Sequence, residues 1–210
     1  MLAPGVPTAV AHDIAAHAGD PKAMAKAVVD RTMDATFGFD GIDSYGPAAA
    51  FDVIDLAADK TTAVATAIRT LDADLVSASD NRSVRAAIRE DAKAIDGMVR
   101  FPGSQTMPWR ADRPAIALYD TLSQDGRLPE TVRADALHAK VAVAATVLAH
   151  RESDDFAAFH DADYSNAAGP TVHLPVSPRQ IDPWAAGGIS ETDNAFYKSV
   201  GAADLTRALA

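Results

Sequence analysis

The chain of 210 residues contains no cysteine. It therefore supplies no disulfide, no thiolate zinc site, no iron–sulfur cluster and no cysteine nucleophile. It also lacks any apolar run of about 18 residues, so we expect no membrane-spanning helix. The first residues lack the basic region and apolar stretch of a secretory signal, although a longer parent protein could carry one.

Positive charge is scarce. The sequence has 19 Lys and Arg against 29 Asp and Glu, which gives a formal net charge of −10. Nucleic-acid binding requires clustered basic residues, and here they are scattered among aspartates, so we expect no nucleic-acid partner. The 48% of hydrophobic residues is typical of a globular chain rather than a disordered one. We expect one structural unit over residues 1–210.

Helical periodicity dominates the sequence. Alanine makes up roughly a fifth of the chain and favours closely packed helices. Apolar residues recur at spacings of three and four, which is typical of amphipathic helices. The predicted helices cover residues 8–18, 21–37, 61–77, 83–98, 114–123, 131–150 and 190–200.

Two predicted helices carry the clearest apolar faces. In residues 61–77 the face consists of Val64, Ile68, Leu71 and Leu75. The longest predicted helix, residues 131–150, has a face formed by Leu137, Val141, Ala144 and Leu148. We expect the first of these faces to be left uncovered in the isolated chain, because it suits packing against a sheet.

Two short apolar segments, residues 50–56 and 170–175, are predicted strands. The fold class is thus α+β and mainly helical. A lone strand cannot satisfy its backbone groups, so each must pair with another strand. We expect both to be additions to a sheet that lies largely elsewhere, and to lie side by side in this chain.

One acidic segment resembles the start of a calcium-binding loop. Asp161, Asp163 and Ser165 supply oxygen ligands at its first, third and fifth positions. The expected glycine at the sixth position is Asn166, and the expected glutamate at the twelfth is Val172. The alternatives are an irregular calcium site and a solvated Asp-rich turn.

Other polar residues give weaker signals. Asp52 and Asp55 are three apart on a predicted strand, so their side chains point to opposite faces and do not form an acid–base pair. One of them is expected to cap the following helix or to meet a partner at the sheet end. His12 with His17, and His138 with His150, are out of phase on predicted helices and are interpreted as surface histidines.

The order of segments resembles the C-terminal half of the clostripain-like cysteine peptidases, which have a caspase fold. The similarity lies in packing motifs spread over nearly the whole chain. They are residues 2–5 (Leu-Ala-Pro-Gly), the helix over 21–33, the strand 51–56 (Phe-Asp-Val-Ile-Asp-Leu), residues 117–120 (Ala-Leu-Tyr-Asp), the strand 169–175 (Gly-Pro-Thr-Val-His-Leu-Pro) and the pair Phe196-Tyr197.

The resemblance implies a caspase-like α/β sheet that these strands would extend, but it transfers no catalytic residue. The histidine–cysteine dyad of that family lies upstream of the segments found here. The resemblance therefore implies a non-catalytic region: part of a longer peptidase, one piece of a split enzyme, or a degenerate relative that has kept the scaffold and lost the chemistry. In the first two cases its partner is an upstream catalytic segment or subunit, and peptides are substrates only of the complete enzyme. A stand-alone helical binding or scaffold module, or a homodimer joined through strand edges, is the alternative.

Overall fold

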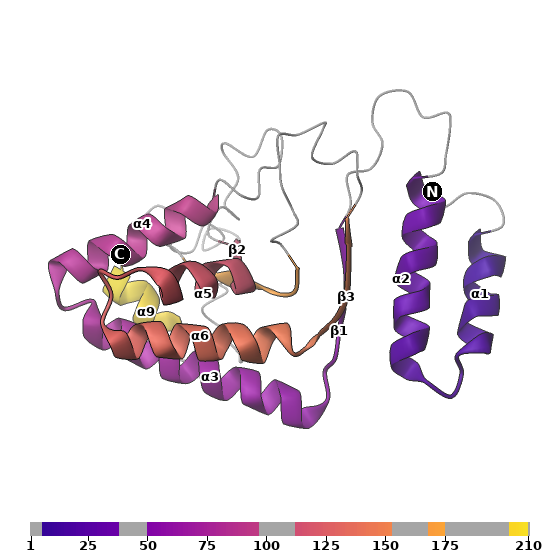
Figure 1. The fold of residues 1–210 in the computed structure, drawn as a ribbon, viewed down its shortest axis with the longest axis horizontal. Coiled ribbons are helices and arrows are strands. Elements are labelled where there is room, and N and C mark those ends of the chain that lie inside the picture. The colour runs from indigo at the N-terminus through magenta and orange to yellow at the C-terminus, as the bar shows by residue number, and fades with distance from the viewer. Residues whose placement is uncertain (1–5, 38–49, 97–111, 153–167, 175–201, 210) are drawn as a thin grey trace, which may run out of the picture.

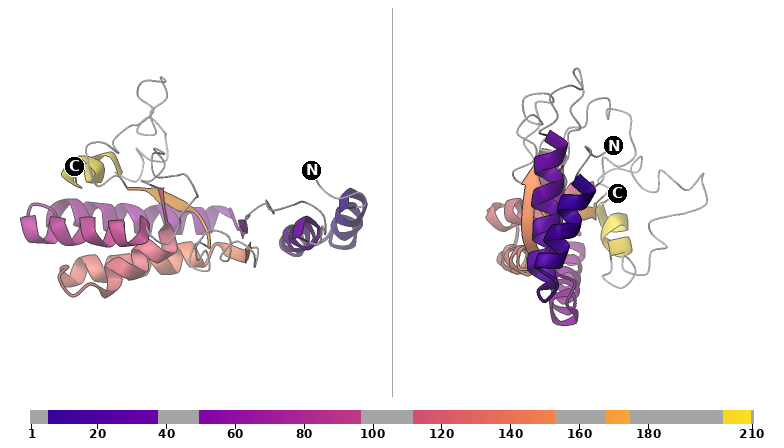
Figure 2. Two further views of the ribbon diagram at one scale, coloured as in Figure 1. Left: turned by 90° about the horizontal axis from the view of Figure 1, so that it is seen from above. Right: turned by 90° about the vertical axis from the view of Figure 1, so that its right-hand side faces the viewer.

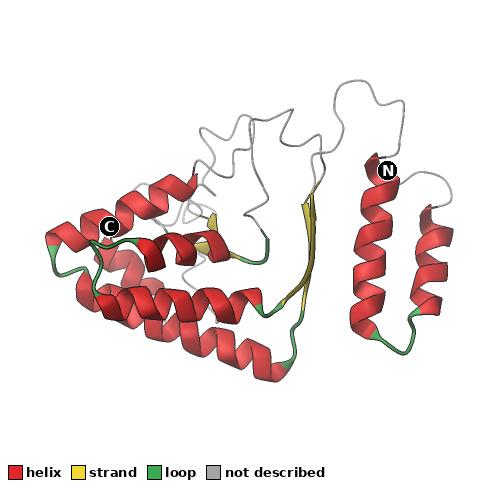
Figure 3. Ribbon diagram, viewed as in Figure 1, coloured by secondary structure: helices red, strands yellow, loops and turns green. Residues whose placement is uncertain are grey.

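The computed structural model describes residues 6–37, 50–96, 112–152, 168–174 and 202–209. These residues are mainly helical, with a few short antiparallel strands, which confirms the α+β class at that level. The predicted final helix over 190–200 and the candidate calcium ligands lie outside the described residues. Figure 3 shows how far helix outweighs strand.

Two N-terminal helices, α1 (Val6–Ala16) and α2 (Pro21–Phe37), form a hairpin at one end of the molecule (Figure 1). The Asp20 carboxylate accepts hydrogen bonds from the backbone N–H groups of Lys22 (3.0 Å) and Ala23 (3.1 Å), which caps α2 as its Asp-Pro start predicts. No side chain of the hairpin whose exposure is described is fully buried.

Strand β1 (Ala50–Ile54) pairs antiparallel with β3 (Val147–Glu152), and Asp52 lies opposite His150. We call this pair the ribbon. Figure 1 shows it between α2 and the helices that follow β1 in the chain. Arg151 donates to the backbone carbonyl of Asp30 on α2 (3.3 Å), so the face that carries Arg151 is the one turned toward α2. Asp52 and His150 lie on the opposite face.

Five helices form the core: α3 (Ala58–Ala78), α4 (Arg82–Asp96), α5 (Ala115–Gln124), α6 (Glu130–Ala144) and α9 (Ala202–Leu209). In Figure 2, α5 and α6 lie on one side of α3 and α4, and α9 lies on the other. The most deeply buried large side chains are apolar residues of these helices, together with one arginine from a neighbouring strand. The small residues Ala136 and Ala139 are fully buried on α6, as close helix packing requires.

A second strand pair joins β2 (Asp112–Pro114) to β4 (Thr171–His173) beside this core. The side chain of Arg113 is fully buried, and it donates to the carbonyl oxygens of Ala92 (2.6 Å) and Leu174. Gly169 precedes β4 with φ of 90°, and a Cβ there would lie 3.0 Å from the side chain of Val147. Glycine is thus required by both backbone conformation and space.

The two predicted strands exist but do not pair with each other, which corrects the expected side-by-side arrangement. Residues 50–54 pair with β3, and residues 171–173 pair with β2. The reason is that the chain supplies two further strands, at 112–114 and 147–152, which the helical periodicity of the sequence did not reveal.

The predicted helix over 131–150 is too long. It ends at Ala144, where Thr146 donates both its backbone N–H (2.9 Å) and its hydroxyl (2.7 Å) to the Val143 carbonyl. Both bonds take up a carbonyl of the last turn and stop the helix. The chain then continues as β3.

The predicted apolar face of α6 is wrong, whereas that of α3 is confirmed in its residues but not in its exposure. Leu137 and Val141 are 51% and 57% exposed, and α6 instead buries the face of Val132, Ala136, Ala139 and Val143. The α3 face is covered rather than uncovered. Its members Ile68, Leu71 and Leu75 belong to the helical core, because α6 and α9 pack on α3 where a sheet was expected.

Candidate functional site

The candidate calcium ligands Asp161, Asp163 and Ser165 lie outside the described residues, so the calcium hypothesis stays a prediction. Within the ranges that the structure describes, no three His, Asp or Glu side chains come together as a metal site would need. The polar side chains whose arrangement best suits proton transfer lie instead on the ribbon.

Across the ribbon, Asp52 faces His150. The Asp52 Oδ1 atom lies 2.8 Å from His150 Nδ1, and the side chains are 23% and 16% exposed. A carboxylate only accepts hydrogen bonds, so Nδ1 carries the hydrogen of this bond. In the neutral ring, Nε2 is then left as an acceptor.

The Nε2 atom of His150 is buried and has no hydrogen-bond partner among the described residues. A histidine oriented by a carboxylate, with one free nitrogen, can accept a proton or a hydrogen bond from a third group. Nucleophilic catalysis would require a hydroxyl or thiol within hydrogen-bond reach of that nitrogen. The described part of the chain brings none there, so Asp52 and His150 form an incomplete site.

A second polar group lies just after the end of β1. The Asp55 carboxylate accepts from Lys22 Nζ (2.5 Å) and from the Ala57 N–H (3.1 Å), and Lys60 Nζ lies 3.8 Å away. The hydrogen bond from Lys22 is the main cause that lowers the pKa of Asp55. The same contact raises the pKa of Lys22. Asp55 thus holds α2, β1 and the start of α3 together.

The structure confirms that Asp52 and Asp55 do not act as a carboxylate pair, since one meets His150 and the other meets Lys22. Of the two roles expected for one of these aspartates, the structure shows the second. Helix α3 has no side-chain cap, and Asp55 instead meets Lys22 at the end of β1. His12, His17 and His138 are exposed, as their spacing predicts.

His150 is the residue that sequence reasoning missed. The sequence predicts a surface histidine on a long helix, whereas His150 is mostly buried and paired on a strand. The sequence signal for a strand is weak: residues 146 and 147 are β-branched, and no ionisable residue occurs between 141 and 149.

None of the described helices is long and apolar enough to cross a membrane. Comparison of the chain with protein-family models, with curated proteins and with solved structures finds no match.

Proposed function

We propose that this chain is a non-catalytic region of a clostripain-like cysteine endopeptidase, in which it completes the sheet and supports the substrate cleft. The observation that carries the proposal is the ribbon. Among the described residues, β1 and β3 have only each other as neighbours. A two-stranded ribbon is marginally stable alone, and its outer edges suit pairing with further strands.

Two further observations support a partner that supplies the chemistry. The chain has no cysteine, so the nucleophile of such an enzyme must come from another segment or subunit. The site formed by Asp52 and His150 is incomplete in the described residues. The net charge of −10 would bias the complete enzyme toward peptides that carry Arg or Lys, as a weak long-range attraction.

A second candidate function is a stand-alone helical binding module. It is favoured by the core, in which α3, α4, α5, α6 and α9 bury their apolar residues against each other without a sheet. The exposed side chains of Leu137 and Val141 on α6 would then be the binding face.

The coding sequence upstream of Met1 provides the first test. A histidine followed by a strand that ends in an Asp-Ala-Cys type of sequence would supply the missing dyad. That segment, expressed separately, should form a 1:1 complex with this chain and gain hydrolysis of Arg and Lys peptides, whereas this chain alone should hydrolyse none. A complex that forms without any gain in hydrolysis would contradict the peptidase assignment.

A matched pair of variants separates the two functions. Phe51→Lys places a charge on the ribbon, and Leu137→Lys places the same charge on α6; both side chains are exposed large apolar residues, at 38% and 51%. Sheet completion predicts that only Phe51→Lys abolishes the complex, because a lysine on an edge strand opposes pairing. Loss of binding in Leu137→Lys alone would instead support the helical binding module.

A further inference from the structure

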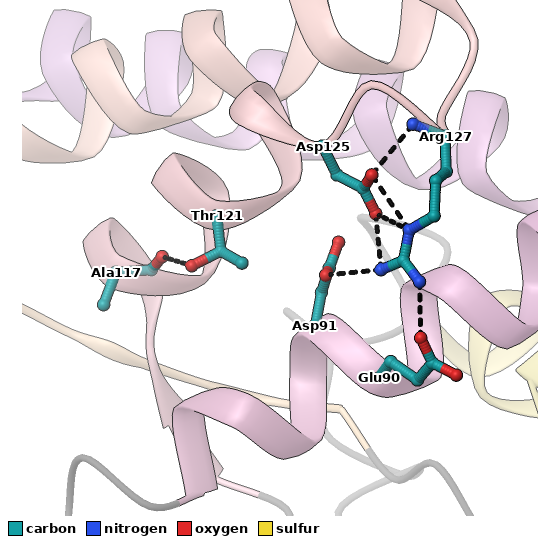
Figure 4. A network of polar contacts seen from close by, with 6 residues as sticks. All are labelled: Glu90, Asp91, Ala117, Thr121, Asp125 and Arg127. Atoms are coloured by element: carbon teal, nitrogen blue, oxygen red, sulfur yellow. Dashed lines mark hydrogen bonds and ion pairs between the residues drawn. The ribbon is translucent and has the colours of Figure 1, made fainter.

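Four charged side chains meet where α4 passes the turn between α5 and α6 (Figure 4). Arg127 lies at the centre. Its guanidinium donates to Asp125 at 2.8–3.0 Å, to Asp91 Oδ1 at 3.3 Å, and to the Glu90 carboxylate. Asp125 also accepts the backbone N–H of Arg127 (2.8 Å), which fixes the turn. One guanidinium therefore serves three carboxylates from two parts of the fold.

Asp91 is the member of this group that is incompletely paired. Its side chain is only 10% exposed, and its Oδ2 atom is buried with no donor among the described residues. In Figure 4 this oxygen points toward the Asp125 carboxylate. The nearby hydroxyl of Thr121 on α5 donates to the Ala117 carbonyl (3.0 Å) rather than to Asp91. A buried carboxylate oxygen without a donor is costly.

A single proton would reduce the negative charge of this group and give the unpaired oxygen of Asp91 a partner. With every group ionised, three carboxylates and one guanidinium leave the group with two excess negative charges, partly buried. A proton on Asp91 removes one of these charges and makes its carboxyl a donor toward Asp125, as in other close carboxyl pairs.

We propose that Asp91 and Asp125 share one proton, and that this proton closes a clasp between α4 and the α5–α6 turn. We call this group the Asp91 clasp. When the proton leaves, two neighbouring carboxylates repel each other across the contact, and the turn loosens from α4. The ligand of this site is the proton itself, and the fold thereby senses pH.

The electrostatic surroundings support the proposal and fix its direction. Burial is the main cause that raises the pKa of Asp91 to about 7, and the charge of Asp125 adds to it. The hydrogen bonds from Arg127 lower the pKa of Asp125, so the proton resides on Asp91. The charged groups that act on Asp91 are Asp125, Arg127 and Glu90. The α5 side chain drawn beside them in Figure 4, Thr121, is uncharged.

The direction in which the free energy of unfolding changes with pH follows from the linkage between proton binding and folding. Between about pH 4 and pH 7 the folded chain holds this proton more tightly than the unfolded chain does. The contribution of the clasp to the free energy of unfolding is therefore full at pH 4 and is lost as the pH rises through 7.

The direct test is a carboxyl-carbon NMR titration of the full chain. We expect one aspartate carboxyl carbon to titrate near pH 7 and its signal to be absent in Asp91→Asn. Asp125→Asn removes the repelling charge and should lower that midpoint by at least one pH unit. Arg127→Gln removes the attracting charge and should raise it.

Asp120→Asn is the matched control, because Asp120 lies on α5 and pairs with Lys140 rather than with Asp91. It should leave the midpoint where it is. In the same samples, amide exchange at Arg127 and Leu128, corrected for its intrinsic pH dependence, should speed up at least tenfold between pH 6 and pH 8. An Asp91 that titrates near pH 4, or turn exchange that does not change with pH, would overturn the proposal.

Discussion

The helical core and the N-terminal hairpin differ in how they are held. In the core, Leu71, Ile88 and Leu122 are fully buried, and apolar residues of five helices pack together. In the hairpin, no described side chain is fully buried. Polar contacts hold it instead. Arg31 binds Asp13 within the hairpin, and Lys22 binds Asp55, which follows β1. The difference indicates that the core folds by hydrophobic burial, while the hairpin and ribbon depend on contacts that are individually weak.

The strongest test of this difference replaces one apolar side chain in each region. Leu122→Ala opens a cavity in the core and should lower the free energy of unfolding by about 3 kcal/mol, within the usual range for buried leucines. Ile14→Ala, at an α1 residue that is 40% exposed, should cost about 0.5 kcal/mol or less. Urea unfolding of both variants checks the contrast. Equal losses would show that the hairpin is part of the same packed unit.

Replacement of Arg113, the buried arginine of the core, should have the next largest effect on stability. Arg113→Leu leaves the carbonyls of Ala92 and Leu174 without their buried donor, so we expect a loss of about 2–3 kcal/mol. Arg113→Lys keeps the charge but not the forked geometry, and should recover only part of it. Thermal unfolding provides the measurement. An unchanged stability in Arg113→Leu would show that Arg113 does not stabilise the core.

A buried carboxyl in the core predicts that stability depends on pH. Burial raises the pKa of Asp72 to about 8, so the folded chain binds that proton more tightly than the unfolded chain between about pH 4 and pH 8. Stability should therefore fall as the pH rises through this window, by up to about 1.4 kcal/mol per pH unit for one proton.

Asp72→Asn should remove the part of this slope that Asp72 contributes, whereas Asp59→Asn, at an exposed position on the same helix, should leave the slope unchanged. Chemical unfolding at a series of pH values measures both. Any slope left in Asp72→Asn is expected from the Asp91 clasp. A slope that is unchanged in Asp72→Asn would place the titrating group elsewhere.

A smaller effect on stability is expected from calcium. Its addition tests whether the acidic segment 161–165 contributes to stability beside the core and the hairpin. If Asp161, Asp163 and Ser165 bind it, 10 mM calcium should stabilise the folded chain by about 1–3 kcal/mol through mass action and raise the Tm. The double variant Asp161→Ala/Asp163→Ala should lose this rise. A flat titration, or the same rise in that variant, leaves the interpretation as a solvated turn.

Much of the helical part was predictable, because spacing alone identifies a helix. The α3 periodicity located Ile68, Leu71 and Leu75, and the Asp-Pro start located α2. Helix lengths were less predictable. An alanine-rich and valine-rich run has no single face, so α6 could bury Ala136 and Ala139 and leave Leu137 exposed.

The candidate site was less predictable than the fold. Asp52 meets His150 across 98 positions of sequence, and Asp91 meets Arg127 across 36. Such contacts depend on how whole elements pack, which local spacing does not contain. His150 was further hidden because the strand that carries it follows directly on a helix, without a glycine or proline between them.

Native-state hydrogen exchange of the full chain tests the central claim most directly, namely that the core is self-contained while the hairpin and ribbon are held weakly. We predict slow exchange in α3, α5 and α6, near the limit of global unfolding, and much faster exchange through local opening in α1, α2 and β1. Lys22→Ala should speed up exchange in α2 further and leave α5 unchanged. Equal protection in the hairpin and the core, unaffected by Lys22→Ala, would contradict the account.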